Sequence, residues 1–197
     1  MKLEPITLTG ELVRLEPLER RHAADLFAIS QDPRIWTYYN TDLYASPEHT
    51  ERWLNRFLEK RANGEVLPFV IVQLATQRII GFTSYLDFSE RNRGVEIGWT
   101  WLSPDVQRTG VNTECKYLLL RHAFETLGMI RVQLKTHHLN FRSQKAIERI
   151  GATREGVLRN HVIMPDGSYR HSVYFSIIDS EWPQVKAKLE SMMNSYK

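Results

Sequence analysis

The chain has a single cysteine, Cys115, among 197 residues. One cysteine excludes an internal disulfide and a zinc cluster built on thiolates. No apolar run approaches the length of a membrane span, so we expect no membrane partner. The first residues include Glu4 where a leader peptide would have a long apolar segment. The sequence therefore predicts a protein of the reducing cytoplasm.

The glycine-rich motifs of nucleotide sites are also missing. The loop at residues 107–112 reads Gln-Arg-Thr-Gly-Val-Asn and holds one glycine. No Lys-Ser or Lys-Thr pair follows that glycine, as a Walker loop would require. The dinucleotide fingerprint needs three glycines. A nucleotide hydrolase is excluded on these grounds, and because no acidic metal site follows the loop.

Metal ligands at a recognisable spacing are absent as well. His137 and His138 are adjacent at the end of an expected strand, where neighbouring side chains point to opposite faces. No cysteine or carboxylate lies at a spacing that would complete a zinc site with a histidine. We therefore expect no metal cofactor.

The residues that are present have the balance of an ordinary globular domain. Hydrophobic residues make up 42% of the chain and charged residues 25%, with a net charge of +3. A chain of this length predicts one domain over residues 1–197. The mild excess of positive charge suits an anionic cofactor. No nucleic-acid recognition motif accompanies it, so we expect no nucleic-acid partner.

Periodicity and turn signals predict an ordered series of elements. Strands are expected at 11–18, 69–74, 78–88, 94–102, 131–137, 153–163 and 169–178. Helices are expected at 20–30, 46–63, 110–127, 141–150 and 180–193. The order strand, helix, strand around residues 94–137 predicts some parallel pairing. The fold class is therefore mixed α/β (α+β), with a mostly antiparallel, twisted sheet of about seven strands and helices on both faces.

The loop at 107–112 joins a strand to the start of a helix, which is an arrangement suited to phosphate. The first turn of a helix has unpaired N–H groups and partial positive charge. A pyrophosphate placed there accepts several charge-assisted hydrogen bonds. We expect Gly110 to allow close approach of the backbone, and Gln107 and Arg108 to add donors.

Four stretches together resemble the GNAT superfamily of acyl-CoA-dependent N-acyltransferases, and within it the branch that acetylates ribosomal-protein N-termini. The resemblance extends from about residue 12 to residue 182. The four stretches are Glu96-Ile97-Gly98-Trp99, Gln107 to Asn112, Asn140-Phe141-Arg142-Ser143, and Ile150-Gly151-Ala152 with Glu155-Gly156. The last loop position departs from the family, which has glycine or alanine where this chain has Asn112. Its side chain either crowds the pyrophosphate or caps the helix.

The resemblance implies an N-acetyltransferase. Acetyl-CoA would be the cosubstrate, and a primary amine would attack it directly in a ternary complex. The acceptor would be a protein N-terminus or a small molecule, and the protein a monomer or homodimer. The alternative is a non-catalytic acyl-CoA-binding module that senses or scaffolds. Glu96 distinguishes the two, because only the enzyme needs a base in the groove.

The resemblance also assigns roles. Glu96 would be the general base, acting through a water; its other interpretation is a salt bridge to a neighbouring strand. Ser143 would be the acid beside the CoA sulfur, or else a first-turn serine that satisfies backbone donors. Asn140 would contact the cofactor, cap the helix, or do both.

The remaining expected contacts follow the same family pattern. Cofactor contacts are expected from Trp101, Leu102, Gln107, Arg108, Thr109, Gly110, Val111, Asn112, Asn140 and Ser143. The family splays the strand near Trp101 and leaves amides free for the thioester, which a β-bulge would achieve. Trp36, Tyr38 and Tyr39 would line the acceptor groove, or else pack the loop against the core.

Overall fold

The computed structural model describes residues 3–164 and 166–196. All eight strands found in this part of the chain belong to one sheet, in the order β1-β2-β3-β4-β5-β6-β8-β7. The strands are β1 (Leu8–Thr9), β2 (Val13–Pro17), β3 (Val66–Gln73), β4 (Arg78–Ser89), β5 (Gly94–Leu102), β6 (Arg131–His137), β7 (Thr153–Ile163) and β8 (Tyr169–Ile178).

The helices fall between the strands and after the last of them. They are α1 (Ala23–Ile29), α2 (Pro47–Ala62), α3 (Val111–Arg121), α4 (Phe141–Arg149) and α5 (Trp182–Asn194). Short helical turns are η1 (Arg20–His22), η2 (Pro33–Ile35), η3 (Leu43–Ala45), η4 (Pro104–Val106) and η5 (His122–Thr126), the last of which is a π-helical turn that continues α3. Within the described residues, no helix combines the length and the apolar character that crossing a membrane requires.

The sheet confirms the predicted fold class. Every neighbouring pair of strands is antiparallel except β5 and β6, which are parallel. The crossover through α3 therefore gives the expected parallel pairing. The eighth strand is β1, whose two residues pair with β2 and are too few to produce a periodic signal in the sequence.

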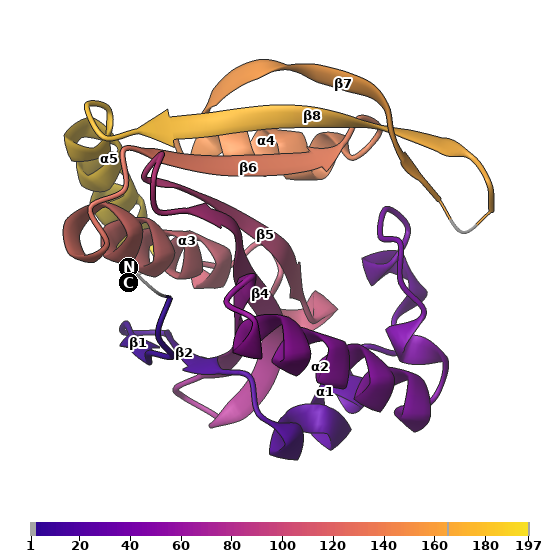
Figure 1. The fold of residues 1–197 in the computed structure, drawn as a ribbon. Coiled ribbons are helices and arrows are strands. Elements are labelled where there is room, and N and C mark those ends of the chain that lie inside the picture. Colours follow the sequence, from indigo (N-terminus) through magenta and orange to yellow (C-terminus); the bar gives the residue numbers. More distant parts are fainter. Residues whose placement is uncertain (1–2, 165, 197) are drawn as a thin grey trace.

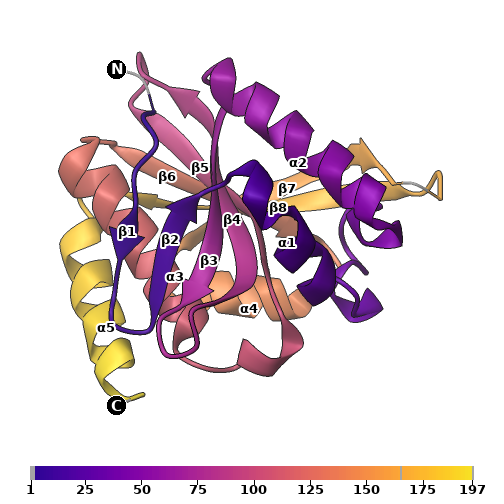
Figure 2. The same ribbon diagram turned by 90° about the horizontal axis from the view of Figure 1, so that it is seen from below.

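Helices cover both faces of the sheet, and each face has its own apolar core. Buried residues of α3, α4 and α5 pack with β2, β6 and β8 on one face. Buried residues of α1 and α2 pack on the other face, where Trp53, Phe57 and Phe82 meet at ring-centroid distances of 4.6 to 5.1 Å. Figures 1 and 2 show α1 and α2 on one side of the strands and α3 on the other.

The two parallel strands separate soon after they pair. β5 and β6 pair over only three residues each, Gly94–Glu96 of β5 with Arg131–Gln133 of β6. On the other edge of β5, the register with β4 shifts next to Trp99, whose φ of 53° is in the left-handed region. A β-bulge of this kind bends a strand away from its neighbour. The expected splay is therefore present, and it opens a gap in the middle of the sheet.

Candidate active site

A cleft of about 800 Å³ occupies the region where β5 and β6 separate. It collects residues from the loop after α1, from β5, β6, β7 and β8, and from the starts of α3 and α4. Of the residues expected at the site, those that line the cleft are Tyr38, Tyr39, Glu96, Trp101, Leu102, Gln107, Arg108, Thr109, Asn112, Asn140 and Ser143. Trp36, Gly110 and Val111 are not among its lining residues.

Glu96 is 1% exposed, yet its carboxylate belongs to the lining of the cleft. Its Oε2 atom lies 3.0 Å from Lys135 Nζ and accepts a hydrogen bond of 2.8 Å from Gln133 Nε2. Burial raises the pKa of Glu96, and the charge of Lys135 opposes that rise. The ion-pair interpretation is confirmed by Lys135 on β6. Because Glu96 also lines the cleft, its assignment as the base stays a prediction.

The start of α3 offers unpaired donors at the other end of the cleft. The Val111 N–H donates to Thr109 Oγ1 over 3.3 Å. Within the described residues, the N–H groups of Asn112 and Thr113 have no acceptor. Such groups at a helix start suit a phosphate oxygen. The helix N-cap is Gly110, so the interpretation of Asn112 as the cap is wrong: Asn112 lies inside the first turn.

Gly110 does not line the cleft and packs instead against side chains from the two ends of the chain. A Cβ atom there would be 3.0 Å from Leu12 Cδ1 and 3.1 Å from Tyr196 Cδ2. Its φ of −65° is open to any residue. The glycine is therefore needed for close packing under Leu12 and Tyr196, which the sequence could not indicate because both residues are remote from the loop.

Basic side chains surround the start of α3, and sequence reasoning missed most of them. Arg108, Arg142, Lys145 and Arg149 all line the cleft. Arg149 donates to Thr113 Oγ1 over 3.1 Å, and Arg142 donates to Gln107 Oε1 over 2.8 Å. The last three of these basic residues are spaced by three and four positions on α4. Such spacing puts them on one helix face and could have revealed them.

Ser143 and Asn140 lie together at the start of α4. Asn140 is the N-cap, and its Oδ1 atom accepts from the Ser143 N–H over 3.0 Å. Both side chains line the cleft, so capping and contact with a ligand are compatible for Asn140. Among the described residues, Ser143 Oγ has no hydrogen-bond partner. The serine hydroxyl is therefore available to a group in the cleft.

The three aromatic residues of the loop after α1 divide between the cleft and the core. Trp36 is 5% exposed, and its indole N–H donates to the Ser30 carbonyl over 2.7 Å. Tyr38 lies 5.1 Å from the His137 ring, centroid to centroid, and Tyr39 donates its hydroxyl to the Thr100 carbonyl. Tyr38 and Tyr39 line the cleft, whereas Trp36 packs in the core against Tyr39 and Trp101.

A buried lysine was also missed. Lys116, on the second turn of α3, lines the cleft and is only 6% exposed. Its Nζ atom donates to Thr100 Oγ1 over 2.7 Å, and no carboxylate pairs with it among the described residues. Burial lowers the pKa of Lys116 to about 8. The signal in the sequence was a lysine between Cys115 and Leu118, on the apolar side of a helix.

The histidines form a stack, contrary to the expectation that His137 and His138 face opposite ways. Their ring centroids are 4.6 Å apart, because β6 ends at His137 and the chain turns there. The ring of His171 lies 4.5 Å from that of His138, tilted by 37°. Within the described residues, no cluster of three or more histidine, cysteine or carboxylate side chains is arranged to hold a metal.

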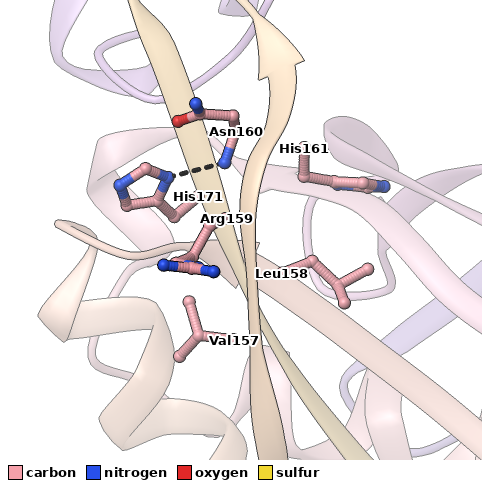
Figure 3. A pocket seen from close by; sticks show the side chains of 6 residues that line it. All are labelled: Val157, Leu158, Arg159, Asn160, His161 and His171. Carbon is pink, nitrogen blue, oxygen red and sulfur yellow. Dashed lines mark hydrogen bonds between the residues drawn. The ribbon is translucent and has the colours of Figure 1, made fainter.

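A second hollow, of about 940 Å³, lies along the outer strand β7. Figure 3 shows that the Asn160 N–H donates to His171 Nδ1, over 2.8 Å, on one side of the strand, with His161 on the other side. Val157, Leu158 and Arg159 complete its lining, which contains no carboxylate. The features of a reaction site are therefore concentrated in the cleft between β5 and β6.

The cleft thus combines a helix start with free backbone N–H groups and a buried carboxylate, an arrangement that suits the transfer of a group from a phosphate-bearing donor. Residues 13–153 match the Acetyltransferase (GNAT) domain, so the chain belongs to the GNAT family of acetyltransferases. The family is one of acetyl-transferring enzymes that use acetyl-CoA. Membership therefore decides against a non-catalytic binding module.

Known proteins resemble the chain over nearly its whole length. The ribosomal-protein-serine acetyltransferase of Escherichia coli is 22% identical over 175 residues, which are 87% of this chain and 96% of that protein. A GCN5-related N-acetyltransferase from Brucella melitensis superposes with a TM-score of 0.91 at 29% identity, covering 98% of this chain and 87% of that one. Mycobacterium smegmatis RimJ in complex with CoA-disulfide shares the fold, with a TM-score of 0.81, 22% identity and 95% coverage of both chains.

Proposed function

We propose that the protein is an N-acetyltransferase that transfers the acetyl group of acetyl-CoA to a primary amine, and that the whole chain works as one such domain. The observation that carries the proposal is the Glu96 carboxylate. It is buried, it lies at the last position where β5 pairs with β6 and lines the cleft that opens there, and its pKa is raised by burial. A carboxylate with a raised pKa is suited to accept a proton near neutral pH.

The proposed donor end of the cleft is the start of α3. The free N–H groups of Asn112 and Thr113 would bind the diphosphate, and the basic face of α4 would balance its charge. The pantetheine arm would extend along β5 toward Trp101 and Leu102, where β6 no longer pairs with the strand. Backbone donors there would stabilise the oxyanion that forms from the thioester carbonyl.

The proposed reaction is one displacement within a ternary complex. Glu96 removes a proton from the acceptor ammonium, through a water. The amine nitrogen then forms a bond to the acetyl carbon, and the bond from that carbon to sulfur breaks. The nitrogen loses its second proton as it becomes an amide. The departing thiolate takes a proton from the Ser143 hydroxyl, which lines the cleft and has no partner among the described residues, and the proton released by the nitrogen restores that hydroxyl through water. Because serine is a weak acid, its contribution is modest.

The test is release of free CoA thiol from acetyl-CoA with a panel of primary amines. In the enzyme with Glu96→Gln, we expect kcat to fall about 100-fold or more, which is the size of a general-base contribution. Acetyl-CoA should still raise the melting temperature of that variant, because the donor end is intact. Glu148→Gln, on the exposed surface of α4, is the matched control. Thiol release that is unchanged by Glu96→Gln would refute the assignment of the base.

Two classes of acceptor remain from the sequence, a protein N-terminus and a small-molecule amine. The named relative that acts on a ribosomal protein supports the first class. The aromatic rings of Tyr38 and Tyr39 suit a cationic amine of either class. We place the protein in the cytoplasm as a monomer or homodimer, on the grounds given by the sequence.

A further inference from the structure

The cleft holds far more positive than negative charge. Glu96 is the only carboxylate among its described lining residues. Eight lysine and arginine residues share that lining: Arg34, Arg108, Lys116, Lys135, Arg142, Lys145, Arg149 and Arg170. The four from the loop before α3 and from α4 surround the proposed diphosphate site. The other four, Arg34, Lys116, Lys135 and Arg170, are not part of that site, so their charges must be balanced elsewhere.

Two of these four cations have an acidic partner: Arg34 forms an ion pair with Asp32, and Lys135 pairs with Glu96. Lys116 and Arg170 each donate to a hydroxyl instead and have no carboxylate partner among the described residues. The one ammonium nitrogen of Lys116 donates to Thr100 Oγ1. The Nε atom of Arg170 donates to Ser172 Oγ over 3.2 Å, while its Nη1 and Nη2 atoms have no acceptor among the described residues and stay available to a ligand.

Arg170 lies on β8, opposite Val162 of β7, at the end of the cleft that holds the proposed base. The side chain is half-buried, and its charge influences Glu96, Tyr39 and His137. Burial and the charge of His138 lower the pKa of His137 to about 4. The His137 ring is therefore neutral near pH 7 and adds no charge to this end of the cleft. A half-buried guanidinium without an acidic partner is costly unless a ligand supplies one.

The loop that includes Tyr38 and Tyr39 bounds this end of the cleft. Figure 1 shows the loop opposite the tip of the β7–β8 hairpin. The two are joined where Asn40 Nδ2 donates to the Ile163 carbonyl over 3.2 Å. Glu96 and Arg170 line the same cleft and their charges interact, so an acceptor whose amine is at Glu96 lies close to the Arg170 guanidinium.

We propose that the acceptor amine also carries a carboxylate, and that Arg170 binds this group while Glu96 receives the proton from the amine. This inference rests on the proposed function and narrows its substrate class. A planar guanidinium pairs with a carboxylate through two parallel hydrogen bonds, which fixes orientation as well as adding affinity. The carboxylate belongs either to a free amino acid or to an acidic residue next to a peptide N-terminus, and the experiment separates these sources.

The experiment compares acceptors that differ only in one carboxylate. Thiol release is measured with alanine against alaninamide, and with the amide of alanyl-aspartyl-alanine against that of alanyl-asparaginyl-alanine. KM is expressed per concentration of unprotonated amine, so that differences in amine pKa do not enter. In at least one pair we expect the carboxylate member to have a KM lower by about tenfold or more, which is the size of a charge-assisted hydrogen bond.

Arg170→Gln should remove that preference by raising the KM for the carboxylate acceptor much more than the KM for its uncharged counterpart, with the KM for acetyl-CoA unchanged. Arg170→Lys should restore part of the preference, because it keeps the charge but not the fork of donors. Arg154→Gln, at an exposed arginine of β7, is the control and should change nothing. A merely structural role would not produce this split between acceptors.

The outcomes separate this inference from the function on which it rests. If no amine releases thiol, the proposed function fails and the inference fails with it. If thiol is released but neither pair shows a preference, or if the preference survives in Arg170→Gln, the inference alone is overturned. The pair that responds identifies the source of the carboxylate.

Discussion

The buried ammonium of Lys116 should cost the protein stability, and replacing it with methionine should return that stability. Methionine has a similar length and is unbranched, so Lys116→Met keeps the packing between α3 and β5. Lys116 is 6% exposed and has no carboxylate partner among the described residues. Its one hydrogen bond goes to Thr100 Oγ1, which also bonds to Thr83 Oγ1 over 2.8 Å. Removing the ammonium therefore leaves the Thr100 hydroxyl paired.

The magnitude follows from the pKa of Lys116, which burial lowers from 10.5 to about 8. Because the pKa is lower in the folded protein, the folded state binds fewer protons than the unfolded chain between pH 8 and 10.5. Stability therefore rises with pH through that window, and the full cost applies below about pH 8. At ~1.4 kcal/mol per pKa unit, the cost is about 3 kcal/mol, from which the lost hydrogen bond to Thr100 removes about 1 kcal/mol.

We therefore expect Lys116→Met to raise the free energy of unfolding at pH 7 by about 1–3 kcal/mol. The gain should shrink toward pH 10. Urea unfolding of both proteins without ligand, at pH 7 and pH 9.5, measures the two differences. Lys188→Met, at an exposed lysine of α5, is the control and should be nearly neutral. If Lys116→Met is less stable than the parent at pH 7, the reasoning about the unpaired ammonium is refuted.

Three further predictions concern other carboxylates and the donor end of the cleft. Glu114 accepts hydrogen bonds of 2.8 Å from three successive backbone N–H groups at the start of β2. Glu114→Ala should therefore lower the free energy of unfolding, measured in urea, by about 3 kcal/mol. The control Glu148→Ala should leave the free energy of unfolding nearly unchanged. A Glu114→Ala protein as stable as the parent would contradict this. The raised pKa of Glu96 should place the acidic limb of the pH profile of kcat/KM above 4.5, with activity rising as pH increases, and Glu96→Gln should abolish that limb. Arg149 lies beside the start of α3, so Arg149→Gln should raise the KM for acetyl-CoA several-fold. The difference in KM should diminish at high salt. An unchanged KM would exclude Arg149 from the diphosphate site.

Much of the donor end was predictable because its signals are local. A strand, a loop with Gly110 and a helix start at Val111 are contiguous, so hydrophobic periodicity and turn residues were sufficient to predict them. The same holds for Asn140, whose position before a helix predicts an N-cap. The acceptor end was less predictable. The aromatic loop before α2 has no periodic pattern, and nothing in it separated buried Trp36 from Tyr38 and Tyr39 in the cleft.

The contacts of Glu96 could not be predicted from the residues around it in the sequence. The sequence placed a carboxylate in an apolar strand, and it left a base and an ion pair as alternatives. The structure shows that Lys135 and Gln133, on the parallel strand β6, both reach Glu96. Their contact depends on the register of β5 against β6, which are joined by α3. Pairing across such a crossover is a long-range property, so it has no signature in either strand alone.

The sequence by itself determined the order of the elements, the family and the loop that leads into α3, because each depends on residues that are neighbours in the chain. Only the tertiary structure decided that β5 and β6 separate after three paired residues, that Lys116 is buried beside Thr100, and that Arg170 has no carboxylate partner among the described residues. These features arise where segments remote in sequence meet. The burial of a side chain and its electrostatic partners depend on contacts between these segments, so no local sequence pattern predicts them.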